Sequence, residues 1–343
     1  MIEPNSIRGR MDAALAGKPV EWPAYSVYDW FVKHRPIDWQ SLFDLGLGQI
    51  NHAQVVKIER PNLQVVETTT PTDEGLRRDV RWITDRGELR EWYLGEWRQE
   101  HLVKQPEDYR IVRRALEGSQ FEATDEPFRR SEASLGNGGI TVGNLKRTPL
   151  MELQIDLAGL ERFSFDLADE APELLELHDL MVELLLRQIK EAVKVPARYL
   201  KLWENLSIET IGRRHYQQRL VPLYRQILEI LGAANKRLLV HYDGKLRLVG
   251  DLIAELDIDG IDSLTPSPEG DLGVAEARKL WPGKFLWLHP SLGWYREPRD
   301  VFQQQIRQMV SDAGPTRFCL MISEDVPPAW QATVPAVLEA LRP

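Results

Sequence analysis

The sequence has 343 residues, 43% of them hydrophobic, and its 43 Lys and Arg against 52 Asp and Glu give a formal charge of −9. This length supports one large barrel-type domain or two medium ones. The acidic balance, with no long basic run, disfavours a nucleic-acid-binding protein. The single cysteine, Cys319, excludes an intrachain disulfide and a multi-cysteine metal site, and its place in the run FCLMI predicts a core residue.

Targeting and membrane signals are not visible in the sequence. No segment reaches the roughly 18–20 apolar residues of a membrane span. The opening MIEPNSIRGRMDAALAGKP contains no apolar stretch of signal-peptide length. We therefore expect a cytoplasmic protein with no membrane partner.

The spacing of hydrophobic residues changes twice in the first third of the chain. Ser6 caps a predicted short helix, a first strand is predicted over 20–26, and residues 27–50 look helical or irregular. A second strand is expected within 45–57. Residues 52–95 then alternate in the strand manner, with turn signals between the runs, which predicts an antiparallel excursion of hairpins.

From about residue 138, strands and helices alternate with short links, which implies parallel strands joined by helical crossovers. The eight strands favour an α/β fold, a (β/α)8 barrel carrying the hairpin excursion as an insertion, over an open doubly wound sheet. We expect one domain over 1–343. The six further strands are predicted at 139–143, 199–204, 237–243, 260–265, 285–289 and 317–323.

Polar residues stand where these strands end, and in such barrels the active site lies at the carboxyl ends of the strands. His241 and Asp243 are two apart, so in an extended strand both side chains can face one pocket. An imidazole and a carboxylate can bind zinc, or they can act as an acid–base pair. In a third interpretation His241 is a hydrogen-bonded structural residue and Asp243 caps the next helix.

Glu324, at the end of the last strand, would add a third group from a different strand. We therefore predict a catalytic or metal centre of His241, Asp243 and Glu324. His289 and Glu204 are reserve ligands or acid–base groups, although either one alone is more often structural.

Several segments, in order along almost the whole chain, resemble the uroporphyrinogen decarboxylase superfamily. The resemblance is carried by NSIRGRMDAALAGKPVEWPAY, WITDRGELREW, KQPEDYRIVRRALE, VHYDGKL, DLIAELDIDGIDSLTPSPEGDLGVAEARKLWPGK and SEDVPPAWQATVPAVLEAL. It implies a (β/α)8 barrel, often a homodimer, and an enzyme that is either a porphyrinogen decarboxylase or a cobalamin-linked methyltransferase.

The methyltransferase branch has a histidine and two cysteines that hold zinc. His241 matches the histidine, while Asp243 and Glu324 stand at the two cysteine positions, so the resemblance implies a harder His/Asp/Glu site for zinc or another divalent metal. It also implies that a partner protein presents a corrinoid. The substrate is expected to be a small molecule.

The decarboxylase branch binds propionates with an arginine-rich stretch near the first strand. This chain instead has Lys33, His34 and Arg35 there. Buried carboxylates without bidentate partners are costly, so we rank methyl transfer or demethylation above decarboxylation. A non-catalytic barrel that binds a small molecule is the alternative outside enzymes.

Overall fold

The computed structural model describes residue 3, residues 5–322 and residues 329–342. The chain forms two compact units: one comprises Met1–Val55, Thr124–Leu145 and Val195–Pro343, and the other comprises Val56–Ala123 and Lys146–Lys194. The expected single domain over 1–343 stays a prediction. None of the described helices combines the length and apolarity that a membrane crossing requires.

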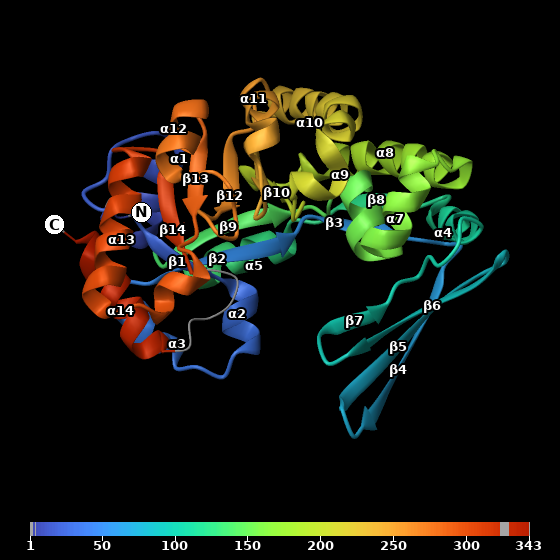
Figure 1. The fold of residues 1–343 in the computed structure, drawn as a ribbon, viewed down its shortest axis with the longest axis horizontal. Helices are drawn as coiled ribbons and strands as arrows, with labels where there is room; N and C mark the ends of the chain where they lie inside the picture. The colour runs from blue at the N-terminus through green and yellow to red at the C-terminus, as the bar shows by residue number, and fades with distance from the viewer. Residues whose placement is uncertain (1–2, 4, 323–328, 343) are drawn as a thin grey trace. The chain divides into compact units, whose positions relative to one another are not determined.

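The first unit is a closed barrel of eight parallel strands, as predicted, rather than an open sheet (Figure 1). Each strand pairs with its two neighbours in parallel register, and β1 and β14 close the ring. In barrel order the strands are β1 (Tyr25–Tyr28), β2 (Gly48–Gln54), β9 (Gly139–Asn144), β10 (Tyr199–Leu202), β11 (Arg237–His241), β12 (Gly260–Leu264), β13 (Phe285–Leu288) and β14 (Phe318–Met321).

The first strand differs from its predicted position at 20–26. It begins at Tyr25, after Pro23, because proline has no N–H to donate to a strand ladder. The shift carries Tyr28 to the carboxyl end of β1, where it faces the barrel centre.

Helices form the outer layer of this unit, and Figure 1 shows α10 to α13 outside the strands. α13 buries Phe302, Ile306, Met309 and Ala313, a spacing of three to four residues that lines one helical face. The helices of the unit are α1 (Ile7–Leu15), α2 (Asp29–His34), α3 (Trp39–Asp44), α5 (Glu126–Leu135), α9 (Ile208–His215), α10 (Val221–Ala233), α11 (Gly250–Ala254), α12 (Val274–Leu280), α13 (Arg299–Ala313) and α14 (Trp330–Leu341).

Glycine permits the close pairing of β2 with β9. A Cβ at Gly139 would lie 1.8 Å from the backbone oxygen of Gln49, so a larger residue would push the strands apart. The pairing continues to His52 opposite Val142, which places the His52 side chain at the barrel mouth.

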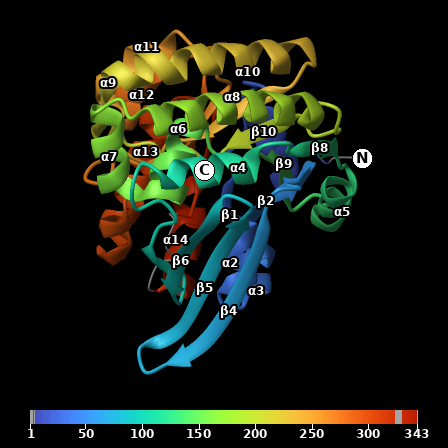
Figure 2. The same ribbon diagram turned by 90° about the vertical axis from the view of Figure 1, so that its right-hand side faces the viewer.

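The second unit contains the predicted antiparallel excursion. Figure 2 shows β4 and β5 as one long hairpin, and a separate two-stranded sheet pairs β3 with β8. The excursion differs from 52–95 at both ends, because residues 52–54 complete barrel strand β2 and the sheet continues to Glu100. The strands are β3 (Val56–Glu59), β4 (Gln64–Thr72), β5 (Gly75–Thr84), β6 (Gly87–Leu94), β7 (Trp97–Glu100) and β8 (Gln120–Ala123), and the helices are α4 (Asp108–Leu116), α6 (Pro149–Glu152), α7 (Gly159–Ala168) and α8 (Pro172–Ala192).

Candidate functional site

A buried ion pair lies at the centre of the barrel mouth. Lys201 of β10 places its Nζ 2.5 Å from Oδ2 of Asp262 on β12, and the two side chains are 2% and 1% exposed. Lysine and aspartate are almost never fully buried unless they are paired. The strand between them, β11, ends in His241, so three neighbouring strands supply this cluster.

Three donors lie within hydrogen-bond distance of one carboxylate oxygen, Oδ2 of Asp262. Besides Lys201, the Nδ1 of His241 lies 2.7 Å from Asp262 Oδ2 and the hydroxyl of Tyr28 donates to the same atom at 2.7 Å. Burial alone would raise the pKa of Asp262, but the charge of Lys201 and the hydrogen bond from His241 hold it well below its usual value. Asp262 is therefore an anion at neutral pH.

Asp262 also determines which nitrogen of His241 carries a proton. Because Nδ1 faces an ionised carboxylate, it is the donor, and a neutral imidazole then has its lone pair on Nε2. That Nε2 lies 3.7 Å from Oδ2 of Asp243, and Asn205 donates to the same Oδ2 at 2.8 Å. The structure thus brings the sequence-predicted residues His241 and Asp243 face to face.

A second histidine extends the cluster on the side of β2. His52 Nε2 lies 3.2 Å from Lys201 Nζ, and His52 Nδ1 lies 2.8 Å from Oδ1 of Asp29. Burial and the positive charge of Lys201 lower the pKa of His52 to about 4, against the opposing effect of Asp29. Burial would raise the pKa of Asp29, but hydrogen bonds from His52 and Lys33 lower it. His52 is accordingly neutral beside a cation.

Aromatic rings cover the lysine. The Nζ of Lys201 lies 3.5 Å from the centre of the Trp203 ring and 4.3 Å from that of Tyr28. Trp203 also lies over both histidines, with centroid distances of 5.0 Å to His241 and 4.6 Å to His52. These rings exclude water from the ion pair and stabilise the buried cation.

His289, at the end of β13, lies near this cluster, with its ring centroid 5.9 Å from that of Tyr28. Burial lowers the pKa of His289 to about 3, with Asp262 opposing and His241 reinforcing the shift. Within the part of the chain that the structure describes, neither Nε2 of His289 nor Oδ1 of Asp262 has a hydrogen-bond partner. Buried polar atoms without partners are the atoms that a bound water or substrate can satisfy.

Glu204 belongs to a different environment. It lies two residues past the end of β10, and its carboxylate is directed toward α10 in the helical layer. There it is fully buried and accepts a hydrogen bond of 2.8 Å from the hydroxyl of Tyr224 on α10. The structure does not place Glu204 with His241 and Asp243, while Glu324 lies outside the described residues.

The described side chains supply two of the three predicted metal ligands. Across residues 5–322 and 329–342 no group of three or more His, Cys, Asp or Glu is arranged to hold a metal ion. Cys319 is a buried core residue of β14, as predicted, and burial raises the pKa of its thiol to about 12. A thiolate ligand at this barrel mouth is thus excluded.

Sequence reasoning missed Tyr28, Asp29, His52 and Lys201 as members of the site. Lys201 carried a signal, since a lysine inside the apolar strand YLKL must be buried with a partner. Asp29 and His52 carried none, because the first two barrel strands were located only approximately.

No protein-family model and no curated protein sequence matches the chain. Among solved structures, a methyltransferase from Methanosarcina mazei is similar with a TM-score of 0.57 and 11% identity, over 98% of each chain. A B12-independent methionine synthase from Shewanella sp. W3-18-1 aligns with a TM-score of 0.44 and 11% identity, over 88% of this chain and 83% of that one. The first likeness shows that this chain shares the fold of a methyltransferase barrel.

Proposed function

We propose that the chain is an enzyme of the uroporphyrinogen decarboxylase superfamily that transfers a methyl group at a divalent-metal centre. His241, Asp243 and Glu324 would hold the metal, zinc in the first instance. A separate corrinoid protein would deliver or receive the methyl group. The observation that supports this proposal best is the orientation of His241, whose Nδ1 is bound to Asp262 while Nε2 faces Asp243.

This orientation fits metal binding. Histidines that bind zinc through one nitrogen usually donate a hydrogen bond from the other to a carboxylate, which fixes the ring. Asp262 has that role toward His241, and Asn205 orients the carboxylate of Asp243. Two ligands about 2.1 Å from a tetrahedral zinc lie about 3.4 Å apart. The 3.7 Å between Nε2 and Oδ2 is close to that separation.

In a methyl transfer the methyl group leaves its donor without the bonding electron pair and bonds to a lone pair of the acceptor, whose proton passes to a base. A bound divalent metal would supply a Lewis acid that lowers the pKa of the acceptor. Asp243, which is 23% exposed at its side chain, is the nearest described carboxylate to Nε2 of His241. If Asp243 is not bound to a metal, its carboxylate can accept the proton that the acceptor loses.

Lys201 and Asp262 keep this geometry in place. Lys201 neutralises the charge of Asp262, so the buried carboxylate stays ionised and remains an acceptor for His241. The ring of Trp203 lies over Lys201 and both histidines. Because it lowers the local dielectric constant, it strengthens the electrostatic interactions beneath it. We expect the reacting atoms to meet beside His289 and Asp262, whose buried polar atoms lack partners within the described residues.

The test is transfer from methylcobalamin to a panel of thiols, amines and hydroxyl compounds, with loss of the methylcobalamin spectrum as the readout. We expect turnover by the wild type and a loss of at least 100-fold in His241→Ala. His34→Ala, which changes an exposed histidine of α2, is the matched control. Release of carbon dioxide from uroporphyrinogen, without methyl transfer, would instead assign the chain to the decarboxylase branch.

A further inference from the structure

The second unit contains a pocket that has no part in the barrel chemistry. It lies between α8, the β3–β8 sheet and the segment from Lys146 to Glu152, and its cavity measures about 40 Å³. That volume holds roughly three water molecules, or a small polar head with a short chain. Its lining comes from helix, sheet and loop, so several parts of one compact unit form its walls.

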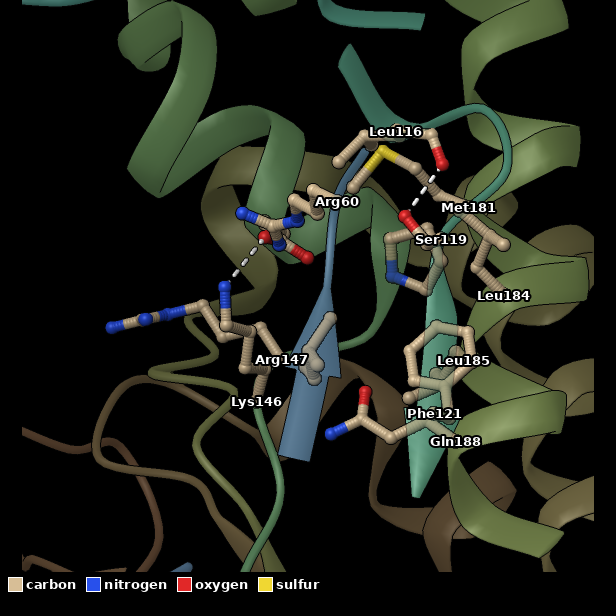
Figure 3. Close-up of a pocket in the computed structure, with 13 residues that line it drawn as sticks. Arg60, Leu116, Ser119, Phe121, Lys146, Arg147, Met181, Leu184, Leu185 and Gln188 are labelled. Atoms are coloured by element: carbon tan, nitrogen blue, oxygen red, sulfur yellow. Dashed lines mark hydrogen bonds and ion pairs between the residues drawn. The ribbon is translucent and has the colours of Figure 1, made fainter. Parts of the chain in front are cut away.

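The pocket has a charged side and an apolar side. Figure 3 shows Arg60, Lys146 and Arg147 along one side, opposite Leu184, Leu185 and Phe121. The apolar wall follows from the sequence of α8, where Leu177, Met181, Leu184 and Leu185 recur every three to four residues and are buried.

Two polar side chains of the pocket make no ion pair and no hydrogen bond with a described residue. Arg60 has no carboxylate within 4.0 Å among the described residues, and its buried Nε has no hydrogen-bond partner there. Its one described ring contact is with Trp82, whose centroid lies 5.8 Å from the guanidinium carbon. Gln188, which is 8% exposed, makes no side-chain hydrogen bond to a described residue, and its amide end points away from α8 in Figure 3.

The other charges of the pocket are already matched. Lys146 lies 3.5 Å from Glu152, the one carboxylate of the lining, and Arg147 lies 3.0 Å from Asp156. Arg60 therefore leaves one uncompensated positive charge in a pocket that also contains the amide of Gln188 and an apolar wall. A guanidinium binds a carboxylate through two parallel hydrogen bonds, and a buried amide supplies one more donor.

We propose that this pocket binds a short-chain carboxylate, with the carboxylate on Arg60 and Gln188 and the aliphatic chain against Phe121 and Leu185. The site is independent of the methyl-transfer proposal, because no residue of the barrel mouth lines it.

The experiment is a calorimetric titration of the full-length protein with sodium butyrate at constant ionic strength, and the same titration with butyramide. We expect saturable one-site binding of butyrate and at least ten-fold weaker binding of the uncharged amide. Arg60→Gln should weaken butyrate binding at least ten-fold and Gln188→Leu at least three-fold. The matched control is Arg86→Gln, which removes the same charge from an exposed turn of the same unit.

Thermal unfolding of each variant establishes that it is folded before it is titrated. Equal affinities for butyrate and butyramide, unchanged binding in Arg60→Gln, or no saturable binding of butyrate by the wild type would each overturn the proposal. Methylcobalamin turnover should be the same in Arg60→Gln and in the wild type, so failure of this site and failure of the barrel chemistry are distinguishable.

Discussion

Lys201 and Asp262 form an ion pair of 2.5 Å in the barrel interior, and both side chains are almost completely buried. The pair joins β10 to β12 across β11 and determines how His241 is oriented. A buried pair of this kind adds little net stability, because desolvation offsets the attraction, but removing one partner is costly. Its role is thus the orientation of the site.

The first prediction concerns this pair. Lys201→Met leaves the carboxylate of Asp262 buried without its cation, so we expect a loss of about 3–5 kcal/mol in the free energy of unfolding at pH 7. The double variant Lys201→Met with Asp262→Asn removes both charges and should recover more than half of that loss. Urea unfolding of the two variants measures both values. Equal losses in the single and the double variant would contradict the pairing.

The second prediction concerns the loss of folding stability at acidic pH. The pKa values of buried His52 and His289 are lowered to about 4 and about 3, so below pH 6.5 the unfolded chain takes up protons that the folded chain does not. Stability should therefore fall as the pH drops from 6.5 toward 4, by up to about 1.4 kcal/mol per pH unit for each histidine. Asp29 and Asp262, whose pKa values are lowered, add to the loss below about pH 4.

Urea unfolding at a series of pH values tests this dependence. His289→Asn should reduce the slope between pH 6.5 and 5 by about 1 kcal/mol per pH unit. A slope equal to that of the wild type would show that His289 is protonated in the folded state.

The third prediction concerns the orientation of Asp243. Asn205 donates to Asp243 at 2.8 Å from a backbone with φ of 46°, a conformation that glycine adopts without strain. Asn205→Gly should keep the turn but release the carboxylate, and we expect zinc affinity to fall about 10-fold. Competition with a metal-binding indicator measures it. An affinity equal to that of the wild type would contradict an orienting role of Asn205 toward the metal ligand Asp243.

The fourth prediction concerns the one cysteine. Cys319 is fully buried and the pKa of its thiol is raised to about 12, so a thiol reagent should not modify the native protein at pH 8. The same reagent should modify one thiol per chain in urea. Rapid modification of the native protein would contradict the position of Cys319 in β14.

The strands of the last two thirds of the barrel could be predicted because each is an apolar run between amphipathic helices. The first strand was harder, since Pro19 and Pro23 leave only the four residues Tyr25–Tyr28 for it. The same difficulty hid Asp29, which follows β1. His52 was missed because its strand, β2, was located only approximately within 45–57. The meeting of His241 with Asp243 follows from local spacing, whereas the meeting of His241 with Asp262 depends on strand register.

The proposed metal site at His241 can be tested by a zinc titration of the chelator-treated protein, with His241→Ala, Glu324→Gln and the control His34→Ala in parallel. We expect one tight site per chain in the wild type and in His34→Ala. We expect an affinity at least 100-fold lower in His241→Ala and a clear loss of affinity in Glu324→Gln. Absence of a tight site in the wild type, or an undiminished site in His241→Ala, would contradict the proposed metal site.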